Sequence, residues 1–261
     1  MPKCSKRQGC PRLRLRTPDE IASFLIRKFR DEKIKYIVEE FAKWGFTKET
    51  LLKDENTLFQ FLVLVSFDRI PYSPYELVWD VNDPNSVFSV LKRSGLLELD
   101  KVKSLSEDEL NDILGTLKVK NLHLSYLDLF KKIKTAKTMK DISSKIEQNA
   151  FQLNNINSAS DVIKLHKMID DISGIGPTIA SKFIMYTIRC MGIGNVNPSQ
   201  LGVLARHLKN EWRNSKWIRQ LKELGIWEDV YQKLKEDPFS LDYFWNLDRY
   251  YCPKRCNECG F

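Results

Sequence analysis

The chain has 261 residues, of which 43% are hydrophobic, enough to fold around one large core or two modest ones. It carries 42 Lys and Arg against 34 Asp and Glu, and this net charge of +8 is typical of proteins with a polyanionic partner. The first residues, Met1 to Arg7, lack the apolar stretch typical of a signal peptide, and the longest apolar run, around Leu58 to Phe67, is too short to span a bilayer. We expect an intracellular monomer, cytoplasmic or nucleoid-associated, without membrane contact.

Helical periodicity dominates the chain, because apolar residues recur every three or four positions and no set of alternating strands is present. The pattern begins after Thr17 and Pro18, a capped helix start, and first stops at Gly45. The sequence therefore predicts an all-α fold. Further helices are predicted at 47–54, 56–67, 73–80, 84–95, 106–115, 119–134, 138–147, 158–172, 177–191, 198–211, 213–224, 226–236 and 238–246.

The predicted domain organisation has two lobes. Residues 56–155 form a central helical bundle, and 1–55 contribute to a lobe built from both chain ends. The hairpin region and the C-terminal helices, residues 156–245, belong to the same second lobe. The last segment, 246–261, is predicted to be a cysteine-rich loop that holds a metal or an iron–sulfur cluster. The chain crosses between the lobes at the Asn-rich stretch Gln152–Asn157.

One interhelical turn contains the most informative motif. Gly174 and Gly176 flank Ile175 and allow unusual backbone angles, while Ile175 fills the gap between the two helices. Pro177 suits the first turn of the second helix, because its missing N–H would be unpaired there. A small residue, Ala180, lets the helices cross closely.

Such a turn exposes backbone N–H groups at a helix N-terminus, where they bind a DNA phosphate without any base contact. Lys182, one turn further on, adds charge. The alternative interpretation is an ordinary interhelical turn, but the combination of the glycines with Pro177 favours DNA. The predicted DNA-binding residues are Ser173, Gly174, Ile175, Gly176, Thr178 and Lys182.

Three further segments accompany the hairpin: Leu58–Ser66, Phe88–Leu91 with Gly95-Leu96, and Asn195–Arg206. Together they make residues 56–210 resemble the helix-hairpin-helix base-excision DNA glycosylases, the superfamily of endonuclease III. The resemblance implies a two-lobed fold that binds damaged double-stranded DNA. It also implies a DNA repair enzyme that flips a damaged or mismatched base out of the duplex and cleaves its N-glycosidic bond.

Two positions depart from the pattern of that family. Bifunctional members carry a lysine two residues after the second glycine, whose amine forms a Schiff base, but Thr178 stands there and argues against a lyase. Asn197 matches the family's catalytic aspartate, and an amide supplies neither charge nor base. Asp68, after the first core helix, is then the candidate carboxylate, with a turn or helix cap as its alternative role. A catalytically inert DNA-binding or lesion-sensing protein of the same fold stays open.

Other polar residues of the hairpin region receive structural interpretations. Lys182 and Lys167 are amines that can replace the missing lysine, although phosphate contact or solvation is favoured for both. Tyr186 and His166 are interpreted as packed or exposed helix residues. A module for structured RNA is a further alternative.

Three cysteines, Cys252, Cys256 and Cys259, fall within eight residues, a density that indicates a metal or iron–sulfur site. Their spacing also matches the motif of radical S-adenosylmethionine enzymes. Those enzymes place it in a barrel of strands and helices, whereas this chain is helical. Lys254 and Arg255 on the same loop are either DNA-backbone contacts or solvated charges. Aromatic residues beside the loop pack it against the domain: Trp245, Tyr250 and Tyr251.

The resemblance implies that these cysteines hold a [4Fe–4S] cluster, with zinc as the alternative metal. The first spacing is shorter than in endonuclease III, and no fourth cysteine follows. Because the chain ends share one lobe in cluster-bearing relatives, Cys10 is the expected fourth ligand. Cys4 is the other N-terminal candidate, and Cys190 is the second choice, with a small buried apolar residue as its alternative role.

Overall fold

A computed structural model of the chain describes residues 10–68, 78, 81–117, 135–211, 215–252 and 258. All regular elements in these ranges are helical and none is a strand, which confirms the all-α prediction. The predicted helix at 119–134 and nearly all of that at 73–80 lie outside the described residues, and a short helix at Leu99–Ser104 was not predicted. Within the described ranges, no helix is long and apolar enough to cross a membrane.

The chain forms two compact units, which we call the terminal unit (1–38 and 196–261) and the central unit (39–195). The boundary at 38/39 falls inside helix α2 (Lys35–Lys43). The second boundary, at 195/196, lies one residue before Asn197, which belongs to the terminal unit.

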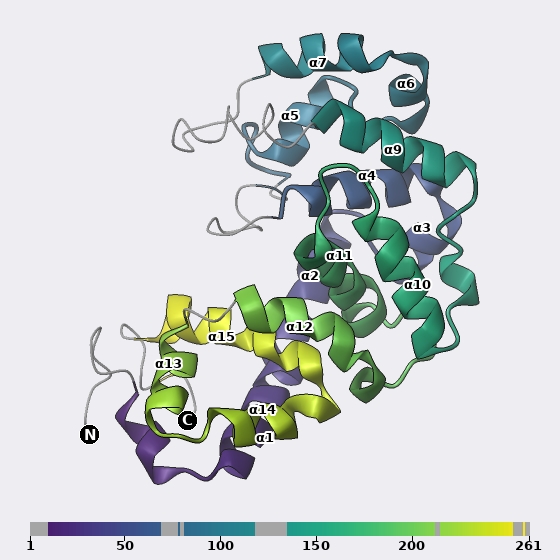
Figure 1. Cartoon of the computed structure of the whole chain (residues 1–261). Helices are drawn as coiled ribbons and strands as arrows, with labels where there is room; N and C mark the ends of the chain where they lie inside the picture. Colours follow the sequence, from purple (N-terminus) through teal and green to yellow (C-terminus); the bar gives the residue numbers. More distant parts are fainter. Residues whose placement is uncertain are drawn as a thin grey trace. The chain divides into compact units, whose positions relative to one another are not determined.

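The central unit is built around α4, whose sequence is almost uninterruptedly apolar from Leu58 to Val65. A helix apolar on all sides is stable only when other helices surround it, and α4 lies alongside α3, α9 and α11 (Figure 1). It begins at Asp54, whose carboxylate accepts hydrogen bonds from the amides of Asn56 and Thr57 at 3.2 and 3.0 Å. The elements of the central unit after α2 are α3 (Lys48–Lys53), α4 (Glu55–Ser66), α5 (Val87–Arg93), α6 (Leu99–Ser104), α7 (Glu107–Thr116), α9 (Thr135–Glu147), η4 (Leu153–Asn155), α10 (Ala159–Asp170), α11 (Pro177–Ile184) and the π-helix η5 (Met185–Cys190).

The terminal unit joins both ends of the chain around an aromatic core. Phe24 of α1 stacks on Trp217 of α13 with ring centroids 6.3 Å apart, and Phe244 packs against the same indole. The predicted helix start after Thr17 is confirmed, because Thr17 and Glu20 form a capping box. Its elements are η1 (Pro11–Leu15), α1 (Pro18–Lys28), the π-helix η2 (Phe29–Ile34), η6 (Pro198–Leu201), α12 (Gly202–Glu211), α13 (Lys216–Glu223), α14 (Trp227–Lys233), η8 (Leu234–Glu236), η9 (Pro238–Asp242), α15 (Tyr243–Asn246) and the π-helix η10 (Leu247–Tyr251).

The observed division differs from the predicted one, which separated the hairpin region from the bundle at Gln152–Asn157. The hairpin belongs to the central unit because α10 packs on α11 and α11 packs on α4. The Asn-rich stretch also stays within this unit, since the Asn195 amide donates to the Ile156 carbonyl at 3.2 Å. A β-carbon at Gly194 would lie 2.7 Å from the same carbonyl oxygen, so the two segments are in close contact.

Candidate functional site

The hairpin joins α10 to α11 through a turn in which Gly174 adopts a left-handed backbone and Gly176 does not. Gly174 has φ +78°, in the left-handed region, and the Ile175 amide donates to the Ile172 carbonyl at 3.0 Å. Ile175 is buried between the helices, as predicted. Gly176 has an extended backbone with φ −113° and ψ 174°, so the prediction of unusual angles at both glycines is wrong for Gly176.

The N-terminus of α11 has no side-chain cap among the described residues. Gly176 is the N-cap residue and provides no side-chain acceptor for the first amides of the helix, and Pro177 follows at the first position. A β-carbon at Gly176 would meet no atom within 4 Å. Thr178 beside it is half-buried. The first amides of α11 thus have no described side-chain acceptor at the positive end of the helix dipole, the position at which helices bind anions.

The helix α9 holds the hairpin in place. The hydroxyl of Thr138 donates to the Ser173 carbonyl at 2.5 Å, and the Asp141 carboxylate accepts from the Ser173 amide at 3.0 Å. The Ser173 amide, one of the predicted DNA contacts, therefore already has an acceptor. Across the hairpin, the buried His166 ring lies 3.1 Å from the Ser181 hydroxyl, so this histidine packs between α10 and α11.

A buried charge cluster lies near the C-terminal end of α11. Asp68 follows α4 and is 1% exposed, and Lys182 of α11 is 4% exposed. The Lys182 ammonium lies 3.2 Å from Asp68 Oδ1 and donates to the Asp68 carbonyl at 3.1 Å. The Tyr186 hydroxyl donates to Asp68 Oδ2. The cluster thus fastens the end of α4 to α11 and the start of η5.

These contacts correct the predicted role of Lys182. Lys182 does not present its charge to solvent, so it is a buried ion-pair partner and not a surface phosphate anchor. The Asp68 carboxylate is bound by Lys182 and Tyr186, and residues 69–77, toward which a cap or turn was predicted, lie outside the described residues. The spacing of Thr178, Lys182 and Tyr186 at every fourth position places them on one face of the helix, the face toward Asp68. Of the predicted cations near the hairpin, Lys167 is exposed.

Asn197 has a local structural role. It is exposed and forms the N-cap of η6, where its Oδ1 accepts from the Ser199 amide and hydroxyl, both at 3.0 Å. These hydrogen bonds give the first amide of η6 an acceptor. They use Oδ1 of Asn197, the residue predicted from the sequence to match a catalytic aspartate.

The described cysteines of the predicted metal site converge on helix α13. Cys10 is fully buried, and its backbone N–H and C=O are both bonded to the Gln220 side chain at 2.6 Å. Cys252 is 8% exposed, and its sulfur accepts from the Trp217 indole N–H at 3.4 Å. Residues 217 and 220 are one helical turn apart on the buried face, about 4.5 Å along the axis, so the two cysteines lie against neighbouring turns. Cys4, Cys256 and Cys259 lie outside the described residues.

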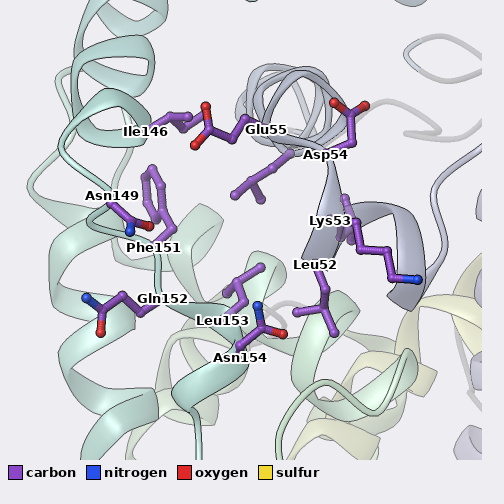
Figure 2. Close-up of a pocket in the computed structure, with 12 residues that line it drawn as sticks. Leu52, Lys53, Asp54, Glu55, Ile146, Asn149, Phe151, Gln152, Leu153 and Asn154 are labelled. Atoms are coloured by element: carbon purple, nitrogen blue, oxygen red, sulfur yellow. The ribbon is translucent and has the colours of Figure 1, made fainter.

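Of the cavities that the described residues of the central unit line, two have no predicted site residue in their lining. Figure 2 shows one of about 190 Å³ between the α3–α4 junction and residues 149–154. The other, about 430 Å³, is lined by aromatic and basic side chains that the sequence reasoning missed, since single cations within helices carry no distinctive pattern. Its lining includes Trp44, Phe88, Lys43, Lys92 and Arg93.

Trp245 and Tyr251, which were predicted to pack the cysteine loop against the domain, contact other residues of the terminal unit, and residues 253–257 of the loop lie outside the described residues. Trp245 is buried, and the Lys33 ammonium lies 4.8 Å from its ring centroid. The Tyr251 hydroxyl donates to Glu32 at 3.2 Å. Cys190 is a buried residue at the end of η5.

Comparison of the chain with protein families, curated proteins and solved structures finds no match. Inference about function therefore depends on the hairpin, the buried cluster and the cysteines.

Proposed function

We propose that this protein binds duplex DNA without reading its sequence, through the hairpin from Ile172 to Pro177. The observation that carries the proposal is the uncapped N-terminus of α11, where Gly176 leaves the first amides without a described side-chain acceptor. The left-handed Gly174 forms the tight turn, and the bonds from α9 to Ser173 hold it rigid, so little entropy is lost when a phosphate binds.

We further propose that the chain is a member of the helix-hairpin-helix glycosylase superfamily that excises a damaged or mismatched base. A terminal unit made from both chain ends and a central unit containing the hairpin support the two-lobed fold of that superfamily. Asp68 is the carboxylate assigned to stabilising charge on the sugar or activating water. Because it is 1% exposed, excision requires that DNA binding opens the Asp68 environment. A lyase step is not part of the proposal, since Thr178 has no amine.

A catalytically inert, lesion-sensing protein is the second candidate, favoured by two observations. Asn197 caps η6 in place of a catalytic acid, and Asp68 is bound by Lys182 and Tyr186 in a way that a purely structural cluster also explains.

We also propose that Cys10, Cys252, Cys256 and Cys259 hold a thiolate-bound metal group. The proposal is supported by Cys10 and Cys252, which are both buried against consecutive turns of α13 although 242 positions separate them in the sequence. A [4Fe–4S] cluster or a zinc ion bound there would cross-link the chain ends. The Gln220 and Trp217 side chains hold the two described ligands in position.

Excision is tested by incubating the protein with a panel of duplexes, each carrying one damaged or mismatched base, and cleaving abasic products with alkali. We expect product on at least one duplex, and its loss with Asp68→Asn. Tight binding to every duplex without product establishes the inert candidate. A covalent adduct trapped by borohydride contradicts the exclusion of a lyase.

A further inference from the structure

The positive charge of the chain is distributed unequally between its two units. The terminal unit contains 22 Lys and Arg against 13 Asp and Glu, a net charge of +9. The central unit, which carries the hairpin, contains 20 against 21, a net charge of −1. Long-range attraction to a polyanion is proportional to net charge, so the hairpin unit contributes almost none of it.

Within the terminal unit, α13 presents a stripe of cations. Its buried face packs against the core, whereas Arg219 and Lys222 are exposed and Lys216 is half-exposed. The three residues lie at every third position and span about 9 Å along the helix axis. This length matches two to three phosphates of one DNA strand, at about 3.4 Å of duplex axis per charge.

The segment η1, which begins against α13, adds exposed arginines to the same unit. The Gln220 side chain binds the backbone of Cys10 through two hydrogen bonds of 2.6 Å, so η1 starts against α13. Leu13 is fully buried, which leaves Arg14 exposed and Arg12 half-exposed on either side of it. We call Arg12, Arg14, Lys216, Arg219 and Lys222 the basic face.

The cations at the exposed centre of the basic face are not neutralised locally. Arg14, Arg219 and Lys222 make no ion pair with any described residue. Other cations of the terminal unit do, as in the pairs Arg16–Glu20 and Lys33–Asp242, both at 3.2 Å. Glu223 is the one exposed carboxylate of α13 and forms no ion pair with these cations among the described residues, so three cations face one anion there. Like charges in excess repel one another, and an external polyanion relieves that repulsion.

We infer that the basic face is a second contact surface for the DNA phosphate backbone, which supplies the salt-dependent part of the affinity while the hairpin supplies a single aligned phosphate contact. The inference rests on the proposed duplex binding and assigns its electrostatic component to the terminal unit. Phosphate contact by Lys and Arg releases counterions, so each contact steepens the dependence of the association constant on salt by about 0.9 in log–log slope.

The test is fluorescence anisotropy of a short undamaged duplex with the full-length protein, between about 50 and 200 mM salt. We expect Arg219→Glu/Lys222→Glu to make the log–log slope shallower by about two and to lower affinity at low salt more than tenfold. The matched control is Lys53→Glu/Lys103→Glu, which changes net charge equally on α3 and α6 and is expected to keep the slope. Circular dichroism of each variant verifies folding.

The outcomes separate this inference from the proposed function. If the unaltered protein does not bind the duplex, both fail. If it binds and Gly176→Asp weakens binding, but the Arg219/Lys222 variant keeps the unaltered slope, only the basic face is refuted. Anionic phospholipid vesicles are the counter-probe: loss of vesicle binding with duplex binding intact assigns the face to a membrane surface and overturns the inference.

Discussion

A carboxylate placed at Gly176 should weaken DNA binding about 100-fold and leave the fold intact. In Gly176→Asp, the new side chain enters space where a β-carbon meets no atom within 4 Å, and the backbone angles of φ −113° and ψ 174° suit any residue. Aspartate is a favourable N-cap, so we expect the free energy of unfolding to change by a few tenths of a kcal/mol at most, in the stabilising direction. The carboxylate then occupies the site of the phosphate.

The expected loss of affinity follows from the two interactions that the phosphate loses in this variant. A hydrogen bond to a charged group contributes about 1.5–3 kcal/mol. The helix dipole adds about 0.3–1 kcal/mol for an anion at this end of α11. Loss of both, about 3 kcal/mol, corresponds to a roughly 100-fold rise in the Kd for duplex DNA.

Two control variants isolate the cause. Gly176→Asn caps the helix equally well but carries no charge, so its Kd should rise much less than that of Gly176→Asp. Gly115→Asp adds the same charge at another glycine where a β-carbon meets nothing within 4 Å, and should keep the unaltered affinity apart from a small electrostatic effect. Anisotropy titration measures the Kd, and urea denaturation measures stability. A folded Gly176→Asp protein with unchanged Kd refutes the hairpin as the phosphate site.

Three further predictions concern the buried cluster, the cysteines and a helix cap. Lys182→Met should lower the free energy of unfolding by about 3–5 kcal/mol, because it leaves the buried Asp68 carboxylate without its cation. Adding Asp68→Leu should recover part of this loss of stability. A double variant that is less stable than either single variant contradicts the prediction. Cys10→Ser should lower the bound iron or zinc measured by elemental analysis and the thermal midpoint together, and an unchanged metal content excludes Cys10 as a ligand. The pKa of Glu109 is held below its ordinary value by the Ser106 amide, so this capping box stabilises the fold above pH 4.5 and its contribution disappears as pH falls through the lowered pKa. The destabilisation caused by Glu109→Gln, measured by thermal denaturation, should therefore shrink in acid, and a pH-independent difference opposes the assignment.

Local patterns predicted much of the helical framework. The capping box at Thr17 and the glycine stop at Gly45 depend on neighbouring residues alone, and both are present in the structure. The turn at Gly174 was equally predictable, because no other residue type takes a positive φ at so little cost. The angles of Gly176 were not, since glycine adopts extended and left-handed backbones alike.

The sequence did not predict which residues far apart in the chain are in contact. A lysine at a helix position is usually exposed, and nothing near Lys182 indicates the carboxylate of Asp68, 114 positions earlier. The same holds for the domain division, because the Asn-rich composition of Gln152–Asn157 resembles a linker whether or not residue 195 bonds to it.

The sequence by itself determined that the chain is helical, that a glycine-bounded turn precedes α11, and that cysteines gather near one end. These features follow from periodicity, backbone sterics and spacing, which act over a few residues. Only the tertiary structure decided that Lys182 is buried with Asp68, that Cys10 and Cys252 meet the same helix, and that the excess positive charge belongs to the unit without the hairpin. Those outcomes depend on which helix faces pack together, and packing joins residues that local preferences treat as independent.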